Sequence, residues 1–141
     1  MTLSGLVLDF FGVLTDSDGA PAHVEPPLVA VVRSARAAGL RTALLSNAEG
    51  RRADDGLDEL FDAVVISGEV GLSKPDPQIY RLTAERLGLS TVECVFVDDL
   101  RGNVTGAVLA GMVGIHHQTV PATVAELGIL FDREFPASRP G

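Results

Sequence analysis

The chain has 141 residues, the usual size of one domain, and 46% of them are apolar, so a sizeable core can form. Aromatic residues make up only 5%, and the core must therefore be aliphatic. The formal net charge of −8 argues against a nucleic-acid partner, because surfaces that hold nucleic acid carry clustered lysine and arginine.

The start of the chain carries no pattern of a targeting or membrane-spanning segment. Its first apolar run has no basic region before it and is interrupted by Asp9 and Gly12. The single cysteine, Cys94, excludes an intrachain disulfide and a cysteine-based zinc site. We therefore expect a cytoplasmic protein without a membrane partner, with Cys94 as a small buried hydrophobe.

Strands and helices are predicted to alternate along the chain. Continuous apolar runs predict strands, and amphipathic runs bounded by proline and glycine predict helices. The predicted strands are 3–10, 42–45, 63–66, 95–97 and 113–116, and the predicted helices are 27–38, a short one within 50–59, 78–87, 103–112 and 121–127. A glycine- and proline-rich loop is predicted over 69–77.

This alternation is typical of an α/β fold with a mostly parallel sheet covered by helices on both faces. We expect a three-layer, Rossmann-like domain with about five strands over residues 1–131. The segment 132–141 contains two prolines, two arginines and few apolar residues. It is predicted to be a flexible tail.

Polar residues stand where the predicted strands end. They are Asp9, Ser46, Asn47, Asp98 and Asp99. Lys74, the only lysine beside ten arginines, lies in the loop after the third strand. In parallel sheets ligands bind beyond the carboxyl ends of the strands, so we expect these groups to converge on one edge.

The converging groups suit a phosphoryl group and a divalent cation. Two carboxylates held close together, such as Asp9 and Asp98, repel one another unless a cation lies between them. Mg²⁺ prefers hard oxygen ligands and keeps positions for phosphate oxygens. Lys74 adds a second positive charge, and Ser46 and Asn47 add neutral hydrogen-bonding groups.

Four segments resemble, in order, the four motifs of the haloacid dehalogenase superfamily. They are LVLDFFGVLTD, LLSN, GLSKPDPQIY and VFVDDLRGNVTGAVLAGM. They fall on the expected strand ends and together cover most of the chain. On these motifs the chain is identified as a member of the superfamily.

The resemblance implies a metal site. Asp9 matches the nucleophile that forms a covalent aspartyl intermediate, and its carboxylate and the backbone carbonyl of Phe11 would bind Mg²⁺. Asp98 and Asp99 match the acids that bind the metal, directly or through water. Asn103 lies in the helix that follows and matches a position that, in many family members, contacts the ligands rather than the metal.

The resemblance also implies how a phosphorylated substrate is held. Ser46 matches the hydroxyl that binds a phosphoryl oxygen, with Asn47 beside it as a further substrate-binding residue. Lys74 matches the lysine that steadies both the nucleophile and the transferring group. Asp9, Ser46 and Lys74 are thus the predicted catalytic residues.

The first motif departs from the pattern of the phosphatases, which read Asp-x-Asp where this chain has Phe11 as the third residue. The missing aspartate protonates the leaving oxygen and later activates water, so we expect a Mg²⁺-dependent phosphohydrolase with weakened leaving-group catalysis. One alternative is a non-catalytic domain that binds Mg²⁺ and a phosphorylated ligand or a protein partner. Another is a dehalogenase, because an aromatic residue at this position resembles the true dehalogenases. The adjacent acids Asp98 and Asp99 favour phosphoryl chemistry.

The second departure is the short connection between the first strand and its helix, residues 15–26, which leaves no room for a cap domain. Capless relatives often act on large substrates or borrow a lid from another subunit. We therefore expect the molecule bound at this site to be a phosphorylated small molecule or a phosphorylated macromolecule. The mean hydropathy of +0.27 is high for a small chain, so we expect that a homodimer could cover part of the surface. Asp16 and Asp18 are expected at a solvated turn, and His116 and His117 in structural or exposed positions.

Overall fold

The core of the fold is a parallel sheet of five strands, described in a computed structural model that covers residues 2–50 and 56–136. The strands are β1 (Gly5–Leu8), β2 (Arg41–Ser46), β3 (Ala63–Ile66), β4 (Cys94–Asp98) and β5 (Val113–His116), in the order β3-β2-β1-β4-β5. All four neighbouring pairs are parallel. The α/β fold with a mostly parallel sheet of five strands is confirmed.

Each central strand is buried on both faces, which explains why its sequence is apolar without interruption. In β1, Leu6 and Leu8 belong to one hydrophobic core and Val7 to the other. The same alternation places Val95 and Val97 of β4 in the first core, because successive strand residues point to opposite faces.

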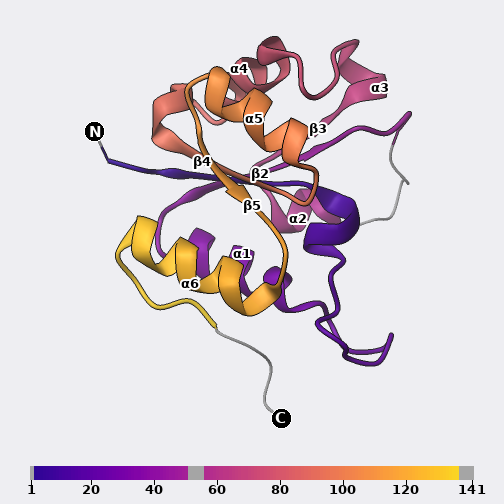
Figure 1. The fold of residues 1–141 in the computed structure, drawn as a ribbon, viewed down its shortest axis with the longest axis vertical. Coiled ribbons are helices and arrows are strands. Elements are labelled where there is room, and N and C mark those ends of the chain that lie inside the picture. The colour runs from indigo at the N-terminus through magenta and orange to yellow at the C-terminus, as the bar shows by residue number, and fades with distance from the viewer. Residues whose placement is uncertain (1, 51–55, 137–141) are drawn as a thin grey trace.

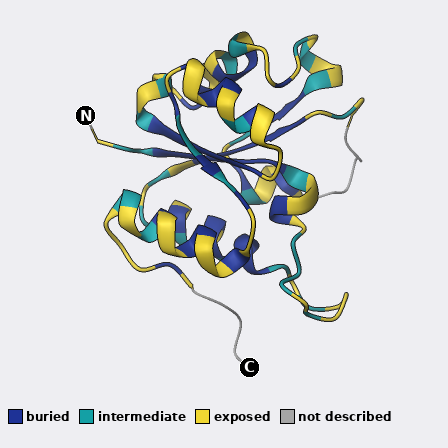
Figure 2. Cartoon of the chain, in the orientation of Figure 1, coloured by how far each residue is buried: buried dark blue, intermediate teal, exposed yellow. Residues whose placement is uncertain are grey.

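Helices cover both faces of the sheet and complete a three-layer domain (Figure 1). Helices α1 (Pro27–Ala37) and α6 (Val120–Phe131) pack on the first core, and α4 (Pro77–Arg86) and α5 (Arg101–Leu109) on the second. Figure 2 shows buried strands between helices whose outward faces are exposed. The short elements are η1 (Phe10–Leu14), α2 (Leu57–Leu60), α3 (Ser67–Val70) and η2 (Thr91–Glu93).

Several predicted element boundaries differ from those of the structure. The first strand is shorter than 3–10 at both ends, because the chain turns into η1, where Gly12 adopts a φ of 80°. The predicted loop 69–77 begins within α3, which ends at Gly71 with a φ of 74°. The helix predicted within 50–59 is seen as α2, and residues 51–55 lie outside the described residues.

The segment predicted as a flexible tail begins with an ordered contact. Phe135 is buried in the first core, and its ring lies 6.2 Å from that of Phe131 in an edge-to-face arrangement. Residues 137–141 lie outside the described part of the chain.

The strand order fixes where a ligand site can form. The chain runs from β1 outward through β2 to β3 and then returns to place β4 on the other side of β1. The carboxyl ends of β1 and β4 therefore flank the point at which the order reverses, the usual ligand crevice of such sheets. Asp9 and Asp98 lie at these two ends. No described helix combines the length and apolar character needed to cross a membrane.

Candidate active site

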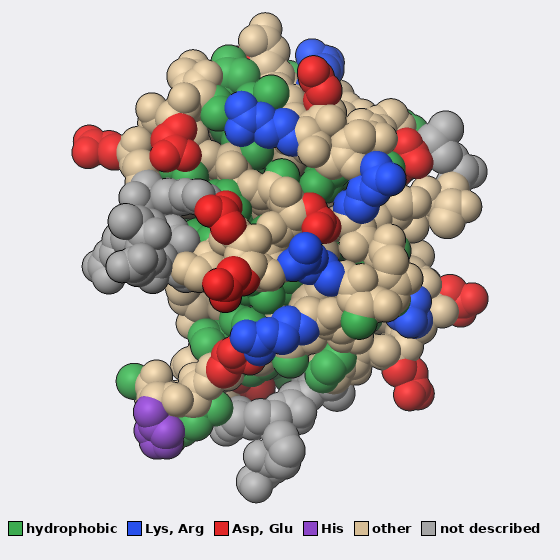
Figure 3. All heavy atoms as spheres, turned by 180° about the vertical axis from the view of Figure 1, so that it is seen from behind, with side chains coloured by type: hydrophobic (Ala, Val, Ile, Leu, Met, Phe, Trp, Pro, Cys, Tyr) green, Lys and Arg blue, Asp and Glu red, His purple; other side chains and the backbone are tan. Residues whose placement is uncertain are grey.

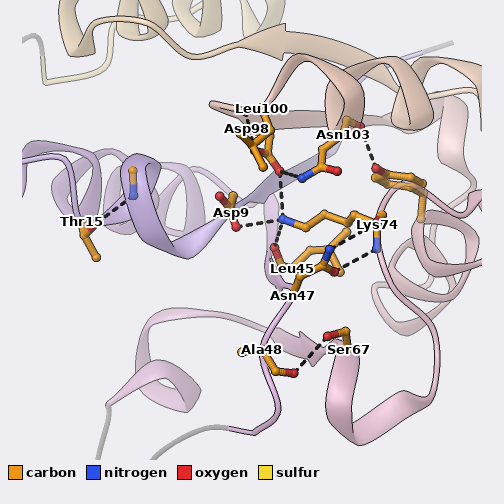
Figure 4. Close-up of polar contacts among 12 residues, drawn as sticks. Asp9, Thr15, Leu45, Asn47, Ala48, Ser67, Lys74, Asp98, Leu100 and Asn103 are labelled. Atoms are coloured by element: carbon orange, nitrogen blue, oxygen red, sulfur yellow. Dashed lines mark hydrogen bonds and ion pairs between the residues drawn. The ribbon is translucent and has the colours of Figure 1, made fainter.

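The ammonium of Lys74 lies at the centre of a polar cluster at this crevice (Figure 4). Its Nζ donates to Asp9 Oδ1 at 2.8 Å and to Asp98 Oδ2 at 2.9 Å. It also donates to the carbonyl of Leu45 at 3.1 Å, so all three N–H groups have an acceptor. The side chain is only 1% exposed, and a buried charge of this kind is retained only where it is paired.

The loop that carries Lys74 is fixed from two sides. The side-chain amide of Asn47 donates to the carbonyl of Lys74 at 3.0 Å and accepts from the backbone N–H of Lys74 at 2.9 Å. On the other side Pro75 packs against Gly106 of α5, where a Cβ would lie 2.7 Å from the proline ring. The chain then enters α4, whose first turn is capped by Asp76.

Three carboxylates gather beside the ammonium. One oxygen each of Asp9, Asp98 and Asp99 lies within 4.8 Å of the other two. Asp98 is fully buried and is oriented by the backbone N–H of Leu100 at 2.9 Å and by the amide of Asn103 at 3.1 Å. Its position is therefore determined before any ligand arrives.

The charges of this cluster are not balanced by Lys74 alone. Burial raises the pKa of Asp9 above its ordinary value, the ammonium of Lys74 opposes this rise, and the carboxylate of Asp98 adds to it. The net rise means that the ionised form of Asp9 is held at a cost. Three oxygen donors with excess negative charge fit a hard divalent cation such as Mg²⁺. Asp9, Asp98 and Asp99 are the residues that could hold it.

The turn after β1 brings the backbone of η1 close to these acids. A Cβ on Gly12 would lie 2.4 Å from Asp99 Oδ2, so a larger residue there would displace the carboxylate of Asp99. Phe11, one residue earlier, has an extended ψ of 132° and a side chain that is 69% exposed. Its aromatic ring is therefore exposed to solvent and makes an edge-to-face contact with the ring of Phe10, at 4.8 Å between centroids.

Most of the predicted site residues are brought together. Asp9, Lys74 and Asp98 are in direct contact, and Asp99 lies beside them. Ser46 is the buried last residue of β2, between Leu45 and Asn47, which both bond to Lys74. The side-chain amide of Asn47, predicted to bind substrate, bonds to the backbone of Lys74 instead. The ring of Phe11, whose backbone carbonyl was the predicted ligand, faces solvent.

Two histidines contact the end of β4, and neither was predicted to have a role in the site. Nε2 of His116 lies 3.0 Å from the carbonyl of Asp99 and must carry a proton, since a carbonyl only accepts. The backbone N–H of His117 donates to the carbonyl of Asp98 at 2.8 Å, and its ring nitrogens contact Thr123 and Asp16. The expectation that Asp16 is a solvated turn residue is therefore wrong. Its partner lies too far along the chain for any local pattern to indicate it.

A shallow pocket of about 470 Å³ opens next to Lys74. It is lined by Asn47, Ala48, Glu49, Ser67, Gly68, Gly71, Leu72 and Ser73. Gly68 lets α3 approach the end of β2, because a Cβ there would lie 1.9 Å from the carbonyl of Glu49. The pocket thus lies between the segment after β2 and the segment around α3, and Asp9, Lys74 and Asp98 are not among its lining residues.

Known proteins share this architecture and these segments. A solved structure of an uncharacterized protein from Corynebacterium glutamicum superposes with a TM-score of 0.81 and 30% sequence identity, over 94% of this chain and 97% of that one. The phosphatase MT3486 of Mycobacterium tuberculosis is 39% identical in an alignment of 87 residues that covers 57% of this chain and 40% of that protein. The phosphoserine phosphatase of Thermus thermophilus is 38% identical over 93 residues, 62% of this chain and 37% of that protein.

The chain spans less than half the length of each of these two curated relatives. The profile of the haloacid dehalogenase-like hydrolases matches residues 22–111, more than half of the chain. This match agrees with the strand order, with the position of the polar cluster and with the relatives above. The protein belongs to the haloacid dehalogenase-like hydrolase family.

Proposed function

We propose that the chain is a Mg²⁺-dependent phosphohydrolase that uses Asp9 as its nucleophile and acts on phosphate esters or anhydrides with good leaving groups. The observation that carries this proposal is the position of Lys74 Nζ, which bonds to Asp9 and Asp98 while Asp99 lies within 4.8 Å of both acids. The names of two relatives, both phosphatases, support the same reaction class.

Asp9, Asp98 and Asp99, with the backbone carbonyl of Phe11, would hold the metal. When bound, Mg²⁺ offsets the negative charge of the acids and of the phosphoryl oxygens that approach them. Lys74 supplies the fixed positive charge on the other side of Asp9. An anionic nucleophile can meet an anionic substrate only where such charge is already in place.

In the proposed reaction a carboxylate oxygen of Asp9 forms a bond to phosphorus while the leaving oxygen takes the electron pair of the bond that breaks. Water then forms a bond to the phosphorus of the aspartyl phosphate, the bond between phosphorus and the Asp9 oxygen breaks to restore the carboxylate, and the proton of the water leaves with the released phosphate or to solvent. Ser46 and the backbone beside Asn47 would bind phosphoryl oxygens, and Lys74 would steady both the nucleophile and the transferring group.

Phe11 determines which substrates turn over. The ring cannot donate a proton, so the leaving group must depart as an anion. For a poor leaving group, the absence of general acid catalysis lowers the rate by about 10²- to 10⁴-fold. Acyl and aryl phosphates suffer least. The short connection over residues 15–26 leaves no room for a cap, so the proposed substrate is either a large phosphorylated molecule or one that is covered by a lid from a second subunit.

The test is hydrolysis of acetyl phosphate and 4-nitrophenyl phosphate by the wild type and Asp9→Asn, with Mg²⁺ and with a chelator. We expect phosphate release that requires both Mg²⁺ and Asp9. Release that continues in Asp9→Asn at the wild-type rate would refute the nucleophile, and release that continues in chelator would refute the metal.

The exposed ring of Phe11 favours one second candidate, a domain that binds a phosphorylated ligand or protein without turnover. Inorganic phosphate with Mg²⁺ would then raise the melting temperature of the wild type, although neither substrate is hydrolysed. The dehalogenase alternative makes a different prediction, the release of halide from 2-haloacids in the presence of chelator. The three acids beside Lys74 speak against it, because a halide needs no carboxylate cluster.

A further inference from the structure

The same strand holds Lys74 at both of its ends (Figure 4). At the backbone end, the amide of Asn47 makes two hydrogen bonds, of 2.9 and 3.0 Å, to the N–H and the carbonyl of Lys74. At the side-chain end, Nζ donates to the carbonyl of Leu45 at 3.1 Å. Leu45 and Asn47 are two residues apart on β2 and its end, about 6.6 Å along a strand. The lysine side chain lies along this stretch.

The site requires the ammonium of Lys74 to be held at a fixed position. A lysine has a flexible four-carbon stem, and its ammonium reaches a fixed point only if its backbone is fixed as well. Lys74 lies in a loop between α3 and α4, where the sheet ladder cannot hold it. The amide of Asn47 replaces that ladder with one donor and one acceptor bond.

We propose that Asn47 is a positioning residue, whose side chain fixes the backbone of Lys74 so that the ammonium lies between Asp9 and Asp98. Its amide oxygen and one amide N–H are both engaged with the loop. The sequence predicted Asn47 to bind substrate, and the proposal assigns its side chain to the lysine instead. The catalytic part of this assignment rests on the function proposed above, but the structural part does not.

Lys74 is the only lysine of the chain, which makes a direct test practical. Protein labelled biosynthetically with ¹³Cε,¹⁵Nζ-lysine gives one side-chain signal by NMR, without any turnover. A buried ammonium with three acceptors exchanges its protons slowly, so we expect a visible ¹⁵Nζ–¹H correlation in the wild type. In Asn47→Ala this correlation should be lost to exchange with water and the ¹³Cε shift should move.

Two further variants sharpen the measurement. Asn47→Asp keeps an acceptor for the N–H of Lys74 and loses the donor to its carbonyl, so an intermediate effect is expected. Gln78→Ala removes an exposed amide on α4, four residues after Lys74, and should leave the signal of Lys74 unchanged. Thermal unfolding of each variant shows whether it is folded, and Asn47→Asp carries the test if Asn47→Ala does not fold. An unchanged lysine signal in a folded Asn47 variant would overturn the proposal.

Kinetics separate positioning from substrate contact. With acetyl phosphate we expect Asn47→Ala to lower kcat by about 10- to 30-fold with little change in KM, as the loss of two hydrogen bonds predicts. In a Lys74→Ala background the same substitution should have almost no further effect. A raised KM with unchanged kcat, or equal losses in both backgrounds, would refute the proposal. If no variant or wild type turns over, the NMR result alone decides it, so failure of the proposed function is distinguishable.

Discussion

The ring of His117 and the carboxylate of Asp16 lie 2.7 Å apart, although 101 residues separate them in the chain. The other ring nitrogen of His117 contacts Thr123 Oγ1 of α6 at 2.7 Å, and its backbone N–H bonds to the carbonyl of Asp98. A single residue thus joins the connection after η1, the start of α6 and the end of β4. The structure predicts measurable consequences for stability.

Replacement of Asp16 by asparagine should make the free energy of unfolding less dependent on pH in the acid range. Partial burial raises the pKa of Asp16, but hydrogen bonds from the N–H of Asp18 and from His117 outweigh it and lower the pKa below 3.8. The carboxylate therefore stabilises the fold above its unfolded pKa, and this contribution is lost as the pH falls through the lowered value. Urea unfolding of Asp16→Asn between pH 2 and 7 should lose less stability in this window than the wild type. Glu126→Gln, an exposed change on α6, is the control.

Asp9→Asn should stabilise the protein in the absence of metal. Burial and the charge of Asp98 raise the pKa of Asp9 despite Lys74, so its ionisation lowers stability as the pH rises from 3.8 through the raised value. Asparagine carries no charge and leaves Lys74 paired with Asp98 alone. In chelator at pH 7 the melting temperature of Asp9→Asn should equal or exceed that of the wild type. A clearly lower melting temperature would contradict this charge balance.

Lys74→Met should destabilise the metal-free protein, whereas Asp9→Asn should stabilise it. Methionine has a similar volume, but it leaves Asp9 and Asp98 facing one another without the ammonium, and breaking a buried pair in this way costs about 3–5 kcal/mol. Mg²⁺ can neutralise the two carboxylates that have lost the ammonium. It should therefore raise the melting temperature of Lys74→Met more than that of the wild type. Denaturant unfolding with Mg²⁺ and with chelator measures both effects. Equal metal effects in the two proteins would show that the acids do not share a cation.

Much of this site could be predicted from the sequence because it depends on strand ends. Continuous apolar runs predicted the strands, and the carboxyl ends of parallel strands must meet at one edge, so Asp9 and Asp98 were expected near one another. Lys74 was expected there from its motif and its uniqueness. None of these inferences needed the side-chain packing.

The missed features all depend on contacts between distant segments. The bond between Asp16 and His117 crosses almost the whole chain, and the two bonds of Asn47 require the loop of Lys74 to be folded back on β2. Phe135 joins the first core only because α6 returns it to the sheet. Local composition predicts a solvated turn, a substrate ligand and a tail at these positions, since it contains no information about the partner.

Phe11→Asp should change the dependence of rate on the leaving group. An acid at this position could protonate the departing oxygen, so hydrolysis of an alkyl phosphate should rise by about 10²- to 10⁴-fold, and by more than that of acetyl phosphate, whose leaving group needs no proton. Because the ring is 69% exposed, the substitution should leave the core unchanged. Phe11→Asn is the control, because asparagine has the shape of aspartate but no acidic proton. If both variants behave alike, something other than the missing acid limits the site.

Gly12→Ala tests whether the approach of η1 to Asp99 shapes the metal site. Gly12 has a φ of 80°, and a Cβ there would lie 2.4 Å from Asp99 Oδ2. Gly19 has a φ of 79° but nothing within 4 Å of its added Cβ. Both substitutions should therefore lose about 1–2 kcal/mol of stability from the left-handed backbone.

Only Gly12→Ala should also displace Asp99. Titration calorimetry with Mg²⁺ should then show weaker binding for Gly12→Ala than for Gly19→Ala, and phosphate release should fall only in the former. Equal Mg²⁺ affinity in the two variants would mean that Asp99 does not contact the metal, either directly or through water. The metal would then depend on Asp9 and Asp98, the two acids that Lys74 already joins.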